Sequence, residues 1–147
     1  MALTSTSTSA ATPLLNGQVI GVTYHAIATV RDRLLAASDL TFHQSVALKA
    51  VADGLAPARA VDRMSATLKI GESEAYALLG ELADAGLLDG ARTSLTDKGD
   101  KLHRGFTDAV AQLAERLYGD LPAVDRETAA RALAHVTARA NAELDAQ

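Results

Sequence analysis

The chain has 147 residues and a formal net charge of −4 at pH 7, so it is long enough for one domain but has no overall electrostatic attraction to nucleic acid. It contains no cysteine, which excludes a disulfide framework, a thiolate nucleophile and any Cys-ligated metal site. It has only two Phe, three Tyr and no Trp, so the core must consist mainly of Leu, Val and Ala, which favours close-packed helices.

The first segment, residues 1–13, consists almost entirely of Ser, Thr and Ala, and we expect it to form a flexible N-terminal arm. It lacks the basic head and the long apolar run of a secretory signal. No stretch of the chain approaches the roughly 20 apolar residues that a membrane-spanning helix needs. These features predict a cytoplasmic protein without membrane contact.

Two helices are predicted in the first third of the chain. Residues 14–37 carry apolar side chains at steps of three and four, which predicts one long helix with a wide apolar face. The residues of this face are Leu15, Val19, Val22, Ala26 and Val30, with Ile20, Ile27 and Leu34 beside them. The run Thr41-Phe42-His43-Gln44 has the form of a capping box, so a second helix begins there and runs to Gly54.

The middle of the chain has the pattern of two short helices at a tight turn, followed by a small hairpin. The apolar positions at helical spacing are Val61, Met64 and Leu68 in the first helix, and Ala75, Leu78, Leu79 and Leu82 in the second. Only Lys69-Ile70-Gly71 separates the two helices, which is typical of a helix-turn-helix. Gly86 suits the left-handed residue that ends a helix. Asp89-Gly90 is a hairpin turn signal between Leu87-Leu88 and a return strand at 92–95, so the pattern predicts a winged helix, mostly α with a small β-wing.

Two further helices are predicted after the hairpin. Thr96 can cap a long helix that ends near Gly119, and Pro122 marks the break before a final helix. Their apolar stripes are Leu102, Phe106, Val110, Leu113 and Leu117 in the long helix, and Ala129, Leu133, Val136, Ala140 and Leu144 in the final one. Together with the first helix, these faces exceed what a small winged-helix core can cover, so they need a partner. A monomeric helical bundle is the alternative, because periodicity does not distinguish burial within a chain from burial between chains.

Three motifs occur in a fixed order along the second half of the chain. Leu82-Ala83-Asp84-Ala85-Gly86-Leu87-Leu88 ends a helix before the hairpin, and Ser94-Leu95-Thr96-Asp97-Lys98-Gly99 leads into the long helix. Residues 121–144 form the third, with Arg131-Ala132-Leu133 and Arg139-Ala140-Asn141-Ala142-Glu143-Leu144. In this order and spacing they resemble the MarR family of bacterial transcription regulators, and the tail is similar to the last helix of actinobacterial members.

The resemblance covers the chain from about Leu14 onward and implies a homodimer in which the terminal helices of two subunits interlock. Residues 14–37 and 107–147 would then be dimerisation helices, and residues 38–106 a winged helix-turn-helix domain. It also implies binding to a palindromic operator in double-stranded DNA.

The predicted DNA-reading surface is the N-terminal end of the second helix of the helix-turn-helix, which enters a major groove in such folds. Its side chains are Ser73, Glu74, Tyr76 and Ala77, with Glu72 beside them. Relatives usually have Ser, Thr and a basic residue at this end, but a glutamate can also accept a hydrogen bond from N4 of cytosine. The expected phosphate contacts are Arg59, Arg63, Lys69 and, in the wing, Arg92. Acidic residues outnumber basic ones between Thr41 and Gly99, which weakens non-specific attraction to DNA.

The resemblance also implies an effector cleft where the first, second and long fifth helices meet. The residues expected to line it, for a small aromatic or phenolic effector, are Tyr24, His25, Arg31, Phe42, His43 and His103. The alternative is that these are ordinary interface residues, because their spacing is not diagnostic. Some relatives sense zinc from these helices, and His43 and His103 match such positions, but Thr107 stands where a second His would be. We therefore predict neither a metal nor a cofactor.

The sequence thus predicts a ligand-responsive homodimeric repressor. Effector binding would change the separation of the two recognition helices, so that they no longer match successive major grooves about 34 Å apart. The alternative is a winged-helix scaffold that has lost DNA readout and acts as a protein-interaction or small-molecule-binding module. No nucleophile elbow, P-loop, Rossmann fingerprint or HExxH is present, so an enzyme is not expected.

Overall fold

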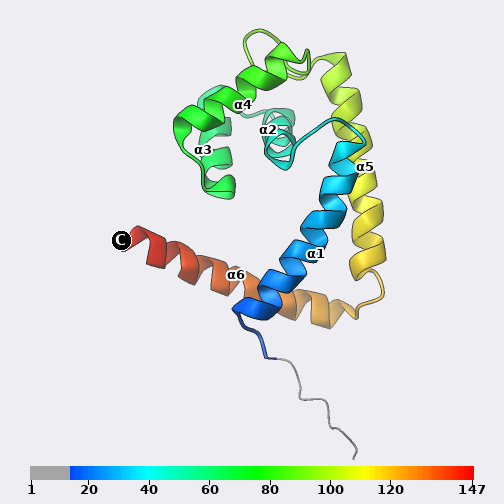
Figure 1. Ribbon diagram of the computed structural model, residues 1–147, viewed down its shortest axis with the longest axis vertical. Helices are drawn as coiled ribbons and strands as arrows, with labels where there is room; N and C mark the ends of the chain where they lie inside the picture. Colours follow the sequence, from blue (N-terminus) through cyan, green and yellow to red (C-terminus); the bar gives the residue numbers. More distant parts are fainter. Residues whose placement is uncertain (1–13) are drawn as a thin grey trace, which may run out of the picture.

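The structure, a computed structural model, describes residues 14–147, so the predicted arm at residues 1–13 lies outside the described part. Within that part, six α-helices follow one another with short connections (Figure 1). They are α1 Gly17–Ala36, α2 Phe42–Ala52, α3 Pro57–Leu68, α4 Glu72–Asp84, α5 Asp97–Tyr118 and α6 Ala123–Asp145. The mostly helical fold class is confirmed.

The helices begin and end where local sequence signals predict. Thr41 accepts a hydrogen bond from the Gln44 amide at 3.1 Å, and the Gln44 side chain accepts one from the Thr41 amide at 3.0 Å, so the predicted capping box is confirmed. The Thr96 hydroxyl caps α5 by accepting a hydrogen bond from the Gly99 amide at 3.1 Å. Gly86 follows α4 with a φ of +75°, the left-handed conformation expected of it. The cap of α1 is Asn16, which the sequence analysis did not single out.

The hydrophobic core lies between the end of α1, helices α2, α3 and α4, and residues 87–88 after α4. Its largest fully buried side chains are Leu35, Leu48, Met64, Leu79 and Leu82. Leu87 and Leu88 are also buried in it, and Phe106 of α5 packs against it. This core is made of aliphatic side chains, as the composition predicts, and it holds α3 and α4 in the helix-turn-helix arrangement (Figure 1).

The segment between α4 and α5 differs from a regular hairpin. Among residues 14–147 no β-strand is formed, and this segment contains one antiparallel bridge, between Leu88 and Leu95. The Asp89 amide donates to the Ser94 carbonyl at 3.0 Å, which closes a six-residue loop. Inside this loop the Arg92 amide donates to the Asp89 carbonyl at 3.0 Å, so the chain turns at Asp89-Gly90, while the strands predicted on either side are reduced to the single bridge. We call residues 87–96 the wing.

The remaining helices extend away from this core. Helix α5 lies beside α1 as it leaves the wing, and α6 turns back across the far end of α1 (Figure 1). No residue of α6 is buried. Large apolar side chains are exposed on both α1 and α6: Val19, Val22, Tyr24, Val124, Leu133 and Leu144. No helix in residues 14–147 is long and apolar enough to cross a membrane.

Candidate nucleic-acid interface and ligand cavity

Helix α4 buries one face and leaves its N-terminal end exposed. The buried residues are Ala75, Leu78, Leu79 and Leu82. The exposed residues are Ser73, Glu74, Tyr76 and Ala77, with Glu72 beside them. The first-turn carboxylates of Glu72 and Glu74 lie at the positive end of the helix dipole, where negative charge favours the helix. The structure thus brings the four predicted base-reading residues together on one accessible end.

Three of the predicted phosphate contacts lie on α3 and at the turn that follows it. Arg59, Arg63 and Lys69 are all exposed. Two of them already have partners, because the Arg63 guanidinium pairs with the carboxylate of Asp53, and Lys69 Nζ donates to Oδ1 of Asn141 on α6 at 2.9 Å. Within residues 14–147, Arg59 forms no ion pair. A phosphate would therefore compete with existing contacts at Arg63 and Lys69.

Asp53 connects this surface with the cavity described below. Lys49 Nζ lies 3.0 Å from the Asp53 carboxylate, which also holds Arg63. The hydrogen bond from Lys49 and then that from Arg63 lower the pKa of Asp53 from its usual 3.8. One carboxylate thus joins a lysine of α2 to an arginine of α3.

The wing is held by a single carboxylate. Asp89 accepts hydrogen bonds from the Thr93 amide at 2.8 Å, the Thr93 hydroxyl at 3.0 Å and the Ser94 hydroxyl at 2.9 Å. These bonds, with the Thr93 amide first, hold the pKa of Asp89 below its usual 3.8. Arg92, the predicted wing contact to DNA, has a φ of +58° and is half-buried.

A cavity of about 390 Å³ lies between α1, α2 and α5. Of the six predicted effector residues, three line it, namely Arg31, Phe42 and His103. The other lining residues are Ile27, Ser45, Val46, Lys49, Phe106, Thr107, Val110, Leu113, Ala114, Leu117 and Tyr118. The predicted meeting place of the three helices is therefore present.

The other three predicted effector residues do not line this cavity. On α1 the cavity face carries Ile27 and Arg31, four residues apart, and His25 lies on the opposite side of the helix, exposed. Tyr24 lines a second, apolar cavity of about 380 Å³ between α1 and α6. On α2, His43 lies one residue beyond the lining residue Phe42, with the two rings edge to face at 6.5 Å.

The cavity is lined mainly by apolar side chains, and Arg31 and Lys49 are its cationic lining residues. The Arg31 guanidinium lies over the Phe42 ring, 3.6 Å from its centroid, which is a cation–π contact. The Arg31 side chain is only 19% exposed and also pairs with Asp32 at 3.1 Å. This arrangement offers an apolar volume with one oriented cation, which suits a small ligand that is aromatic and anionic.

Sequence reasoning missed most of the cavity wall on α5. The spacing of Phe106, Val110, Leu113 and Leu117 predicts a helix-packing stripe and no cavity wall. These four side chains also line the cavity between α1, α2 and α5. The sequence feature that could have indicated this cavity wall is the length of the stripe, which exceeds what the 11-residue α2 can cover.

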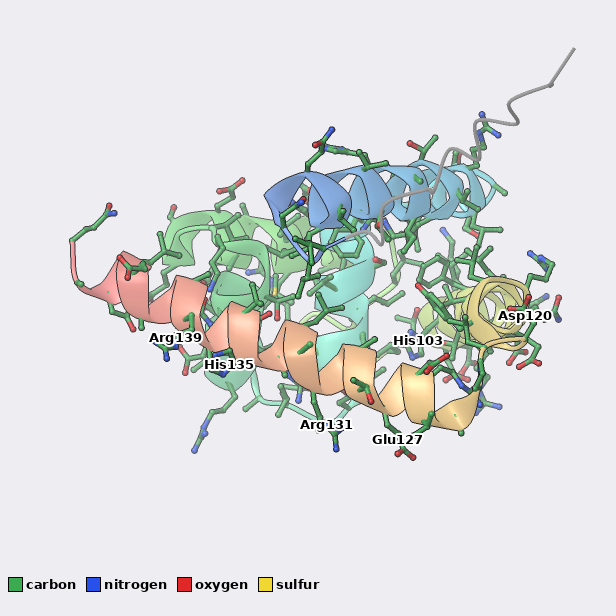
Figure 2. The ribbon with its side chains drawn as sticks, turned by 90° about the horizontal axis from the view of Figure 1, so that it is seen from below. His103, Asp120, Glu127, Arg131, His135 and Arg139 are labelled. Carbon is green, nitrogen blue, oxygen red and sulfur yellow. The ribbon has the colours of Figure 1, made fainter. Side chains whose placement is uncertain are left out.

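His103 and His43 do not form a metal site with their neighbours. In the described part of the chain no group of three or more His, Cys, Asp or Glu side chains lies close enough to hold a metal ion. Of the labelled residues in Figure 2, His103 lies on α5, Asp120 lies in the turn that follows α5, and the other four lie on α6. Figure 2 also shows Glu127 and Arg131 of α6 pointing away from α1, so that the apolar face of α6 is the one turned toward α1.

Comparison with known proteins gives matches at the level of structure. No protein-family model matches the chain, and no curated protein matches its sequence. The MepR–DNA complex of Staphylococcus aureus matches with a TM-score of 0.68 at 20% identity, over 85% of this chain and 96% of that one. CouR from Rhodococcus jostii RHA1, bound to p-coumaroyl-CoA, matches with a TM-score of 0.67 at 17% identity, over 82% of this chain and 90% of that one.

A third match is a MarR family protein of Mycobacterium tuberculosis in complex with salicylic acid, with a TM-score of 0.58 at 21% identity, over 86% of this chain and 99% of that one. MepR is itself a transcription regulator, and a further match is a MarR family transcription regulator. The chain therefore has the winged-helix fold of MarR-family transcription regulators.

Proposed function

We propose that this protein is a DNA-binding transcription regulator that acts as a homodimeric, ligand-responsive repressor in the cytoplasm. The observation that carries the proposal is the exposed N-terminal end of α4, on a fold that matches a regulator–DNA complex over 85% of this chain. It is not proposed to be an enzyme, because the structural neighbours named above are regulators.

In this proposal α4 enters the major groove of a palindromic operator. Ser73, Glu74, Tyr76 and Ala77 would face base edges. Arg59, Arg63 and Lys69 would contact phosphates, and the wing with Arg92 would lie along the backbone beside them. The net positive charge on this surface is low, so binding should depend on contacts to bases more than on electrostatic attraction to the DNA backbone.

The dimer is proposed to form through α1 and the C-terminal helices. Support comes from the large apolar side chains that these helices expose, since a lone chain would leave them in water. Residues 14–37 and 107–147 would form the dimerisation layer and residues 38–106 the DNA-binding domain. Helix α5 runs unbroken across the boundary between the two, so it can transmit movement from one to the other.

The effector is proposed to occupy the cavity between α1, α2 and α5. Two structural neighbours bind aromatic ligands, salicylic acid and p-coumaroyl-CoA, and here the Arg31 guanidinium could pair with the carboxylate of a free aromatic acid such as the first. The cavity lies between the dimerisation layer and the DNA-binding domain. A ligand that fits the cavity at only one distance between these two parts would therefore increase the population of the conformation with that distance.

A second candidate is a winged-helix scaffold without DNA readout. It is favoured by two observations, the glutamates at the N-terminal end of α4 and the existing partners of Arg63 and Lys69. Such a protein would use the same cavity as a small-molecule-binding module or the exposed helices as a protein-interaction surface.

Fluorescence anisotropy distinguishes these functions, using a duplex from upstream of the protein's own gene and a scrambled duplex of equal length. We expect wild type to prefer the first. Ser73→Ala and Tyr76→Phe should each reduce the difference in binding free energy between the two duplexes by about 1–3 kcal/mol, because each variant loses a contact to particular base pairs. Arg59→Ala should weaken both duplexes alike and lower the salt slope by about one.

Arg126→Ala, at the start of α6, is the matched control and should change neither quantity. Equal or absent binding to both duplexes, in wild type and in Glu72→Gln and Glu74→Gln variants, would favour the scaffold.

A further inference from the structure

We propose that Arg92 is a positioning residue that docks the wing onto Gly80 of α4, so that the wing and the recognition helix approach DNA as one unit. The inference rests on the proposed function, since it concerns the surface proposed to bind DNA. It assigns Arg92 a part other than the phosphate contact predicted from the sequence.

The first observation is the place of Gly80. It lies in the interior of α4, where glycine is among the least favourable residues for a helix. A Cβ atom at this position would lie 3.3 Å from Arg92 Nη2 and 3.7 Å from Arg92 Cζ. The guanidinium therefore lies in close contact with this position, and a Cβ atom there would require it to shift by a few tenths of an ångström. Gly105 of α5 differs, because a Cβ there would meet nothing within 4 Å.

The second observation is the backbone of Arg92. Its φ of +58° lies in the left-handed region, which residues other than Gly, Asn and Asp rarely adopt. The Arg92 amide donates to the Asp89 carbonyl at 3.0 Å, and the Asp89 carboxylate holds the next two residues. The loop is thus fixed around Arg92 in a conformation that lays its side chain on α4. Arg92 is half-buried, whereas Ala91 and Thr93 on either side are exposed.

The position of the Arg92 guanidinium determines how the wing contributes to DNA binding. Arg92 is the one basic residue of the wing, residues 87–96, and its charge is held against α4 instead of at the loop tip. The contribution of Arg92 is then to fix the angle between the wing and α4. Any change that removes the guanidinium from Gly80 should have the same effect, even when the positive charge is kept.

The docking itself is tested in the free protein by thermal melting of wild type, Gly80→Ala, Arg92→Ala and the double variant. With Arg92 replaced, Gly80→Ala should raise the Tm by about 3 °C, the gain expected for alanine in a helix interior. With Arg92 present, the gain should be smaller, because the guanidinium must move. Gly105→Ala is the control and should give equal gains in both backgrounds. Equal gains for Gly80→Ala would overturn the docking.

The positioning is tested with Gly80→Gln, which fills the space on α4 but keeps the charge of Arg92. Both Gly80→Gln and Arg92→Ala should speed hydrogen exchange of the Thr93 amide and weaken binding to the own-gene duplex by about tenfold, with an unchanged salt slope. A salt slope reduced by about one in Arg92→Ala, with no effect of Gly80→Gln, would make Arg92 a phosphate contact and overturn the proposal. If wild type binds neither duplex, the proposed function fails, and melting and hydrogen exchange still decide whether Arg92 docks the wing.

Discussion

The close approach of α5 to the base of the wing makes Gly99 the position where one methyl group should matter most. Gly99 is buried in the first turn of α5. A Cβ atom at this position would lie 2.9 Å from the carbonyl carbon of Leu87 and 3.2 Å from its Cα, and nearer still to its oxygen. These are backbone atoms, and the Leu87 carbonyl also accepts a hydrogen bond from the Thr96 amide at 3.1 Å. The methyl group can therefore be accommodated only if α5 and the wing separate.

The cost of Gly99→Ala can be set against a matched substitution in the same helix. Overpacking of this kind costs about 1–3 kcal/mol or more, which exceeds the roughly 1 kcal/mol that alanine gains over glycine in a helix. Gly105→Ala meets nothing within 4 Å and should show the gain alone. At about 3 °C per kcal/mol for a chain of this size, Gly105→Ala should raise the Tm by about 3 °C.

The assay is thermal unfolding followed by circular dichroism at 222 nm. We expect Gly99→Ala to melt several degrees below wild type and Gly105→Ala to melt above it. If Gly99→Ala melts at or above the wild-type temperature, the packing of α5 against the wing described above is wrong.

Four further predictions concern charge, pH, the dimer and the cavity. Asp53→Asn should free Arg63 and strengthen DNA binding at low salt, and an anisotropy titration that shows weaker binding would contradict this. Because the pKa of Asp89 is lowered in the folded state, Asp89 stabilises the protein above the unfolded pKa of 3.8, and this stabilisation is lost as pH falls through the lower folded pKa. In urea titrations, the free energy of unfolding of Asp89→Asn should therefore fall less steeply on the acid side than that of wild type. An equally steep fall in both proteins would refute this role of Asp89. Leu133→Arg places a charge on the apolar face of α6 and should shift the sedimentation of a dimer to that of a monomer or an aggregate, whereas an intact dimer would count against the proposed interface. Ala114→Leu should fill part of the cavity and lower the affinity for salicylate, a probe for small aromatic acids, while DNA binding is kept; unchanged salicylate binding would move the effector site elsewhere.

The helix boundaries could be predicted from the sequence because they depend on local chemistry. Thr41, Thr96 and Gly86 act on backbone groups within a few residues of themselves, so their effect can be seen in a short stretch of sequence. The buried face of α4 followed from the spacing of Leu78, Leu79 and Leu82 for the same reason.

The wing and the cavity could be predicted only in part, because they depend on contacts that spacing does not determine. The sequence predicts a turn at Asp89-Gly90, but it does not reveal that the Asp89 amide bonds the Ser94 carbonyl or that the Asp89 carboxylate accepts hydrogen bonds from Thr93 and Ser94. The rotation of α1 about its own axis decides that Arg31 lines the cavity and His25 does not. The docking of Arg92 on Gly80 brings the wing against α4. In the sequence, Gly80 can be seen only as an unfavourable residue inside a helix, and nothing there indicates its contact with Arg92.

The central claim, that two copies of α4 read successive major grooves, is tested most directly by footprinting the protein on the DNA upstream of its own gene. We predict one protected region whose two halves are related by twofold symmetry, with centres about 10 base pairs apart. Insertion of 5 base pairs between the halves should abolish protection, because it turns the second half-site to the other side of the duplex. No protection, or protection unaffected by the insertion, would contradict the account.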